Sequence, residues 1–210
     1  MISLVLADDQ PTTRTGLRAI FSKTPDIQIV GEAQDGIEAE KLVDQLRPRI
    51  LLLGLKMPGL HPAEVAMWVR THCPETVTLV LTAYDRDEYL AEMMDAGAVG
   101  YLTKNESAET LISSIRRAAQ GEMLFTEEQF TRASGWRAAA GEKWKSLTPR
   151  EREILKLLMQ GSTNATIARS LNITAKTVEH HITNILEKLG LDSAKEAMSW
   201  VHKYLSNDQL

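Results

Sequence analysis

Two patterns of hydrophobic and polar positions divide the chain into a long first part and a shorter last part. In the first part, short apolar runs of strand length alternate with stretches in which apolar residues recur every three or four positions. The expected strands cover residues 3–7, 27–32, 50–54, 77–82 and 100–103, and the expected helices cover residues 12–23, 36–46, 62–72, 86–96 and 107–120. Five strands that alternate with five helices predict an α/β fold, a doubly wound, flavodoxin-like parallel sheet.

The last part contains three short helical patterns over residues 147–191, separated by cap and turn signals. Thr148 and Glu151 form a capping-box pair at the start of the first helix, and Thr174 is the expected N-cap of the third. Two short helices joined by a tight turn, here at Asn172, are typical of a helix-turn-helix motif. A fourth helix is expected to begin at Ser193, which makes this part a small all-α domain.

The third of these helices has a polar face opposite its apolar stripe. The outward positions are Lys176, Thr177, Glu179, His180, Thr183, Asn184 and Lys188. Such donors and acceptors meet base edges or phosphates when a helix lies in the major groove of DNA. The spacing alone fits a three-helix bundle with a solvated polar face about equally well. His181 is expected to pack or cap inside the domain.

Polar side chains follow three of the expected strands in the first part. Asp8 and Asp9 follow the first strand, Thr82 ends the fourth, and Lys104 follows Tyr101 at the end of the fifth. Ligands of such sheets lie at the carboxyl ends of the strands, so we expect these groups to converge. Adjacent carboxylates bind Mg²⁺, and a hydroxyl with a lysine binds phosphoryl oxygens. Taken singly, the acids are better explained as helix caps and the lysine as a surface charge, but their consistent position at the strand ends favours a site.

Both parts resemble known families. TPREREIL, IARSLNIT and KTVEHHITNILEKLGL resemble the DNA-binding domain of the LuxR type. VLADD, LLLGLKMPG, VLTA and GYLTK resemble the receiver domain of two-component response regulators. Together they resemble the NarL/FixJ subfamily, which implies a transcription regulator rather than an enzyme. The resemblance implies base contacts by Glu179, His180 and Thr183. The better candidates for phosphate contacts are Lys176, Thr177, Asn184 and Lys188. The resemblance also implies a dimer contact through the last helix, at Ala194, Ala197, Met198 and Val201.

Position 54 departs from this family. The resemblance places at the end of the third strand an aspartate that accepts phosphate from a histidine kinase, and the chain has Gly54 there. Glycine offers no oxygen, so a kinase partner could not transfer phosphate to it. We expect Mg²⁺ at Asp8 and Asp9 to be weakened or absent, and no cofactor to be required. Switching by Thr82 and Tyr101 would then need another ligand, a partner or the intrinsic balance of states.

Three alternatives stay open at this stage. The glycine is either natural or a laboratory substitution in an ordinary phosphorylated regulator. The receiver-like part could act as a protein-interaction module, with DNA binding vestigial. The third alternative, an enzyme on the same sheet, is the least favoured. It would need a glycine-rich phosphate loop or a nucleophile at the third strand, and the sequence has neither.

Charge is distributed unevenly along the 210 residues, whose net charge is −4. Residues 1–122 hold 12 Lys and Arg against 18 Asp and Glu, whereas residues 146–210 hold 8 against 7. The nearly neutral last part predicts weak electrostatic affinity for DNA, for which a homodimer compensates. A single cysteine, Cys73, and the absence of a signal peptide or membrane-spanning run predict a cytoplasmic protein that does not bind membranes.

The expected domains are a receiver-like domain at residues 1–121, a linker at 122–145 and the helix-turn-helix domain at 146–210. Thr126, followed by Glu127 and Glu128, predicts a short helix over residues 126–133 inside the linker. In the last helix, the apolar stripe runs from Ala194 towards Leu205 and is wider than packing on three helices requires.

Overall fold

The structure is a computed structural model that describes the backbone of residues 1–204 and the side chains of residues 1–201. The chain divides into two compact units, Met1–Ser134 and Gly135–Leu210. Leu205, the end of the expected apolar stripe, lies outside the described residues. No helix in the described part of the chain is long and apolar enough to cross a membrane.

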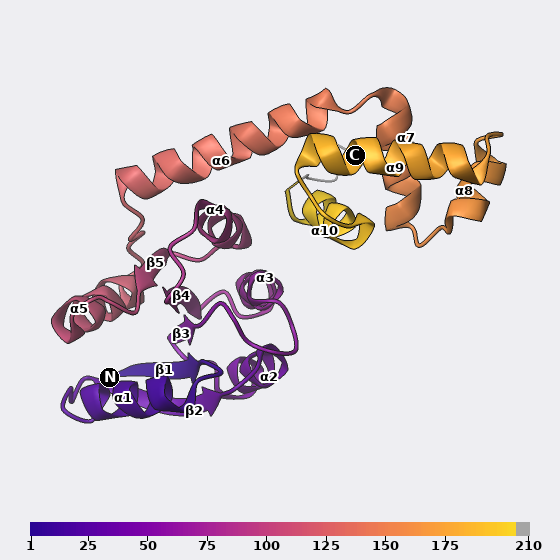
Figure 1. Cartoon of the computed structure of the whole chain (residues 1–210). Helices are drawn as coiled ribbons and strands as arrows, with labels where there is room; N and C mark the ends of the chain where they lie inside the picture. Colours follow the sequence, from indigo (N-terminus) through magenta and orange to yellow (C-terminus); the bar gives the residue numbers. More distant parts are fainter. Residues whose placement is uncertain (205–210) are drawn as a thin grey trace. The chain divides into compact units, whose positions relative to one another are not determined.

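The first unit is a parallel five-stranded sheet with helices on both faces (Figure 1). Its strands are β1 (Ile2–Ala7), β2 (Ile27–Ala33), β3 (Ile50–Leu53), β4 (Val77–Thr82) and β5 (Gly100–Thr103), in the order β2-β1-β3-β4-β5. Its helices are α1 (Pro11–Phe21), α2 (Gly36–Leu46), α3 (Pro62–His72), α4 (Asp87–Ala96) and α5 (Ala108–Ala119). This order is that of the flavodoxin-like sheet, so the predicted fold class is confirmed.

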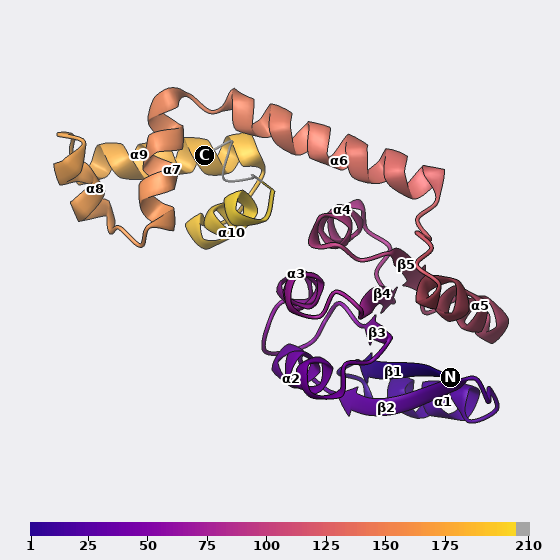
Figure 2. The ribbon, with the colours of Figure 1, turned by 180° about the vertical axis from the view of Figure 1, so that it is seen from behind.

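The core of this unit explains which helix covers which face. Leu17 and Phe21 of α1 and Ile115 of α5 share one cluster with the strand residues Leu4 and Leu52, and all are buried. Helices α2, α3 and α4 cover the opposite face, which the view from behind also shows (Figure 2). Strands that are buried on both faces form the nearly continuous apolar runs from which they were predicted.

Helix N-caps formed by side chains fix where several helices begin. Asp35 accepts a hydrogen bond from the amide of Glu38 at 2.8 Å, and Ser107 accepts one from the amide of Thr110 at 3.1 Å. Such caps satisfy amides that have no partner within the helix, and each stabilises a helix by about 1 kcal/mol. The predicted starts of α2 and α5 are therefore correct.

Helix α6 corrects the prediction for the linker. It covers Glu127–Ser146, 20 residues, rather than a short helix that ends near residue 133. The helix continues through Gly135 and Gly141, although each glycine costs a helix roughly 1 kcal/mol relative to alanine. Packing offsets this cost at the carboxyl end, where Ala140 and Trp144 are 4% and 7% exposed within the core of the second unit. Thr126 caps the helix as expected, accepting from the amide of Gln129.

The second unit contains the carboxyl end of α6 and four more helices around one core. They are α7 (Pro149–Met159), α8 (Asn164–Ser170), α9 (Ala175–Leu189) and α10 (Ala194–Tyr204). Thr148 and Glu151 form the predicted capping box of α7, and Thr174 caps α9. Between α8 and α9, Asn172 has a φ of 52°, a left-handed conformation that asparagine tolerates better than most residues. The predicted helix-turn-helix arrangement of α8 and α9 is present.

Most of the wide apolar stripe on α10 is used inside its own unit. Ala197 and Val201 are 1% and 0% exposed, and Trp200 is 7% exposed. Only Ala194 and Met198 of the expected dimer contact are partly exposed. The extra width of the stripe is therefore taken up by the core that α10 shares with α7 and α9.

Candidate functional site

The groups predicted at the strand ends form an acidic pocket around Asp8, between β1 and β3 where the strand order reverses. Asp8 is 2% exposed. One of its carboxylate oxygens, Oδ2, lies 2.7 Å from Nζ of Lys104, and the other, Oδ1, accepts a hydrogen bond from the amide of Gln10 at 2.9 Å. Asp9 is exposed, so the two acids differ in environment. The lysine and one acid come together as predicted, and they already neutralise each other.

Gly54 lies directly against this pair. Its amide donates to the carbonyl of Ala7 at 2.8 Å, which continues the β1–β3 pairing past the end of β3. A Cβ at position 54 would lie 3.1 Å from Oδ2 of Asp8 and 3.2 Å from the carbonyl oxygen of Ala7. A side chain here would therefore point at the acidic pocket, and Asp8 would have to move by a few tenths of an ångström to admit it.

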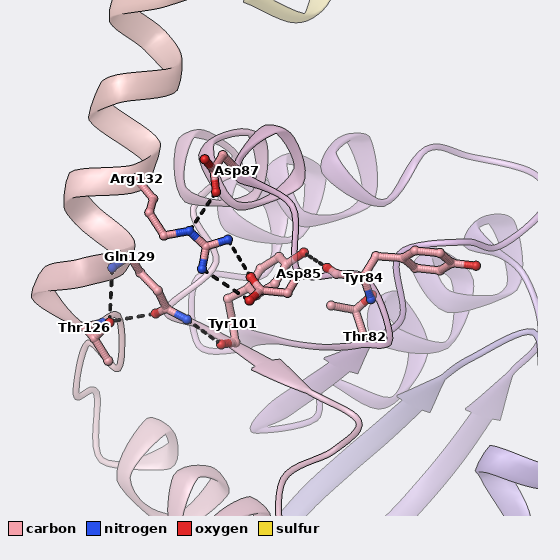
Figure 3. Close-up of polar contacts among 8 residues, drawn as sticks. All are labelled: Thr82, Tyr84, Asp85, Asp87, Tyr101, Thr126, Gln129 and Arg132. Atoms are coloured by element: carbon pink, nitrogen blue, oxygen red, sulfur yellow. Dashed lines mark hydrogen bonds and ion pairs between the residues drawn. The ribbon is translucent and has the colours of Figure 1, made fainter.

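Thr82 and Tyr101 are joined through Tyr84 rather than through the acidic pocket (Figure 3). The hydroxyl of Thr82 accepts from the amide of Tyr84 at 3.0 Å, and the hydroxyl of Tyr101 donates to the carbonyl of Tyr84. Tyr101 is 3% exposed, so its ring is turned inward. Burial, with a smaller contribution from Asp85, raises the pKa of this phenol, which keeps it protonated as a donor.

The outer face of α9 is open to solvent along much of its length. Lys176, Glu179, His180 and Thr183 are exposed, whereas Thr177 and Asn184 are partly buried. The hydroxyl of Thr183 donates to the carbonyl of Glu179 at 3.1 Å, which leaves its oxygen free to accept. Glu179 and Thr183 are four residues apart and therefore share one face of the helix. His181 is partly buried, as expected, and its Nδ1 is buried.

Comparison with known proteins places both units in one family. The family described as response regulator receiver domain matches residues 4–116, and the luxR family of bacterial regulatory proteins matches residues 145–201. The chain belongs to the response regulator family. Its combination of domains is that of the NarL/FixJ type, a group of DNA-binding transcription regulators.

Individual relatives match this response regulator over nearly its whole length. The nitrate/nitrite response regulator protein NarL of Escherichia coli K12 is 38% identical over 207 residues, covering 96% of this chain and 95% of that protein. The transcriptional regulatory protein LiaR of Bacillus subtilis is 35% identical over 206 residues, covering 97% and 98%. The solved receiver domain of a NarL from Mycobacterium tuberculosis is 30% identical, with a TM-score of 0.56, over 58% of this chain and 98% of that one.

Lys188 of the response regulator has a partner that sequence reasoning missed. Its Nζ lies 2.7 Å and 3.0 Å from the two carboxylate oxygens of Glu151, whose side chain is 4% exposed. Burial raises the pKa of Glu151, but hydrogen bonds from Lys188 and from Thr148 outweigh it and hold that pKa below its usual value. Lys188 therefore has a structural role in the second unit, which competes with the predicted phosphate contact.

Other basic side chains of the second unit are also engaged internally. Lys143 donates to the carbonyl of Leu189 at 2.9 Å, at the negative end of the α9 dipole. Arg150 donates to the carbonyl of Leu171 at 2.8 Å. Fewer cations remain for an anionic partner than the sequence count implied.

Arg132 and Gln129 of α6 are functional candidates that the sequence analysis also missed. The guanidinium of Arg132 binds Asp85 and Asp87, and the amide of Gln129 donates to the carbonyl of Tyr101 at 3.0 Å (Figure 3). The spacing of Thr126 and Gln129 is a capping-box signal that predicts a helix start. The contacts made by Arg132, in contrast, join residues more than 40 positions apart and have no local signature.

Proposed function

We propose that this response regulator controls transcription by placing the outer face of α9 in the major groove of DNA, and that its receiver is governed without phosphorylation at position 54. The DNA-binding part of the proposal rests on the exposed polar face of α9, which belongs to a capped, well-packed helix-turn-helix. The LuxR-type match over residues 145–201 supports it.

Glu179 and Thr183 are the proposed base contacts, together with His180. The carboxylate of Glu179 and the oxygen of Thr183 are both acceptors on one face. Acceptors pair with the exocyclic amino groups of cytosine or adenine in the major groove. The half-site is therefore expected to place a cytosine or adenine opposite these two residues, whereas His180 contacts a guanine or a phosphate.

Lys176 is the leading candidate for a phosphate contact, because it is exposed at the amino-terminal end of α9. Thr177 and Asn184 flank it with hydroxyl and amide donors that position the helix on the backbone. Lys188 is left out of this set because Glu151 holds it. With few phosphate contacts per copy, the salt dependence of binding should be shallow.

Two copies bound to paired half-sites would together bind DNA more tightly than a single copy does. Ala194 and Met198 are the parts of the proposed dimer contact on α10 that are accessible. Sedimentation of the full chain with and without a duplex measures this. A single copy on every duplex, at concentrations well above the Kd, would contradict the dimer.

The receiver half of the proposal rests on Gly54 and on the pairing of Asp8 with Lys104. Position 54 has no side-chain atom that can accept a phosphoryl group or bind a metal ion. Both carboxylate oxygens of Asp8 already have partners, and no group of three or more His, Cys, Asp or Glu in the described residues could hold a metal. These residues do not fit a tightly held Mg²⁺, so we propose that the receiver binds this ion weakly or not at all.

Selection of bound sequences from a random duplex library tests the DNA contacts directly. The full chain should enrich paired half-sites, and Thr183→Ala should change the enriched base more than the overall affinity. Lys176→Ala should weaken all sequences alike, by about threefold to tenfold, and lower the salt slope. Lys41→Ala, the same charge loss on exposed α2, is the matched control and should leave binding unchanged. Enrichment of no sequence over the starting library would refute the proposal.

A second candidate function is an interaction module that acts through its receiver. It is favoured by the internal use of Lys143, Arg150 and Lys188, which lowers the charge available for DNA. Two results together would support this candidate. The wild-type chain would show no preference for any DNA sequence. The double variant Glu179→Ala with Thr183→Ala, which lacks the α9 face, would still recover the protein partner that the wild-type chain recovers.

A further inference from the structure

The start of α6 is fastened to the segment between β4 and α4, which we call the switch segment, residues 82–87. Arg132 binds Asp85 through two nitrogens, at 2.7 Å and 3.3 Å, and Asp87 through Nε at 2.7 Å. One guanidinium therefore joins two carboxylates that lie on either side of Arg86, the N-cap residue of α4. The side chain of Arg132 is 25% exposed, whereas those of Asp85 and Asp87 are 51% and 46% exposed, so water screens the carboxylates more than the guanidinium.

Gln129, one turn before Arg132, contacts the other switch element. Its side-chain amide donates to the carbonyl of Tyr101 at 3.0 Å, while its oxygen accepts from the amide of Thr126 at 3.1 Å. Gln129 is thus held by the cap of α6 and holds the backbone of β5. Figure 3 shows Gln129 and Arg132 projecting from the same helix towards Tyr101 and the switch segment.

The switch segment closes the connection back to Tyr101. The inward phenol donates to the carbonyl of Tyr84, and the amide of Tyr84 donates to Thr82. Arg132 fixes Asp85, the neighbour of Tyr84, and Gln129 fixes the backbone of Tyr101. The phenol of Tyr101 and its acceptor, the carbonyl of Tyr84, are therefore held from two sides, by Arg132 through Asp85 and by Gln129 through the backbone of Tyr101. None of these contacts involves Gly54 or the acidic pocket.

We infer that Arg132 and Gln129 of α6 hold the switch segment in place and keep Tyr101 turned inward. A phosphoryl group cannot have this role in this chain. The inference rests on the proposed function, in which position 54 accepts no phosphate. It makes the start of α6 the regulatory input of the receiver. Anything that binds or displaces residues 126–132 changes the position of Tyr101 directly.

The test compares full-length variants by hydrogen–deuterium exchange and by NMR of the ¹³C-labelled tyrosine rings. Arg132→Gln removes the clamp, and Lys145→Gln is the matched control, because it removes an exposed pair with Glu142 on the same helix. Each partly exposed ion pair changes an opening equilibrium by up to about fivefold, so losing two should speed exchange over residues 84–88 by about tenfold. The Tyr101 resonance should move in Arg132→Gln only.

A charge swap separates a specific clamp from general destabilisation. Arg132→Asp combined with Asp87→Arg should restore much of the protection that Arg132→Gln loses, and exchange in β1 and β3 should stay as in the wild type. Unchanged exchange over residues 84–88 and an unmoved Tyr101 resonance in Arg132→Gln would overturn the inference, and so would a swap that restores nothing. Neither readout involves DNA or phosphate. The failure of a DNA-binding or phosphorylation experiment would therefore not change how this result is interpreted.

Discussion

The pair of Lys188 and Glu151 gives a prediction that separates a structural role from DNA contact. Substitution Lys188→Met keeps the aliphatic stem of the side chain and removes the ammonium group. Glu151 then remains buried with only the amide of Thr148, at 2.7 Å from Oε2, and its own cap interactions. A carboxylate in that position is poorly solvated and has lost the ammonium group that it contacts in the wild type.

The expected cost follows from the burial of the two partners. Removing one partner of a fully buried pair costs about 3–5 kcal/mol, whereas exposed pairs contribute about 1 kcal/mol or less. The side chain of Glu151 is 4% exposed and that of Lys188 is 35% exposed, so the pair lies between these limits. We expect Lys188→Met to lower the free energy of unfolding by about 2 kcal/mol. Because the capping hydrogen bond survives, the loss should stay below the fully buried limit.

The pH dependence has a definite sign. The pKa of Glu151 is lowered in the folded chain, so its ionised form adds stability above the unfolded pKa, and that stability is lost as the pH falls below about 4.5. Burial is the largest single influence on this group and raises its pKa. Without Lys188, burial is opposed only by the cap, so the pKa of Glu151 in the folded chain should rise, and the loss of stability on acidification should be smaller than in the wild type.

Urea unfolding of the full chain, followed by tryptophan fluorescence, measures both effects, because Trp144 and Trp200 lie in the core of the second unit. Lys195→Met, an exposed lysine on α10, is the control for the charge change alone. A double variant with Glu151→Gln gives the coupling energy of the pair. Equal stability of Lys188→Met and Lys195→Met, or a coupling near zero, would refute the reasoning and return Lys188 to the set of free phosphate contacts.

Substitutions at three further positions test local features. Gly16→Ala should stabilise the first unit by up to about 1 kcal/mol in thermal unfolding, because a Cβ there meets open space within a helix. Gly36→Ala should destabilise it by about 1–3 kcal/mol, since its Cβ would lie 2.3 Å from the carbonyl oxygen of Leu60; a melting temperature at or above that of the wild type would contradict this. Thr174→Ala should cost about 1 kcal/mol by removing the cap that accepts from Thr177, and Thr174→Ser should restore most of it, as measured by urea unfolding.

The alternation of apolar runs was enough to predict the sheet and its helices, because each element carries its own local signals. Asp35, Ser107 and Thr174 cap helices within three residues of themselves, so their roles follow from spacing. The length of α6 did not follow, since the helix continues through Gly135 and Gly141, whose cost only packing of the helix offsets. The burial of Val201 likewise depends on which helices surround α10.

The candidate sites were predictable only where the fold brings residues together by rule. Parallel strands end at one edge, so Asp8 and Lys104 could be placed together from sequence. The partners of Lys188 and Arg132 lie 37 and more than 40 positions away, in other elements whose placement no local periodicity specifies. The inward ring of Tyr101 is accompanied by contacts of Gln129 and Arg132 that no local pattern predicts, so the sequence indicated the switch residues but not their state.

Phosphorylation at position 54 is the most direct test of the central claim, that this DNA-binding response regulator is governed without it. The full chain and the variant Gly54→Asp are incubated with acetyl phosphate and Mg²⁺ and weighed by intact-mass spectrometry. We expect no phosphoryl adduct on the wild-type chain and an acid-stable, base-labile adduct on the variant, whose new carboxylate would extend towards Asp8 and Lys104. A phosphoryl adduct on the wild-type chain, mapped to any residue of the acidic pocket, would contradict it.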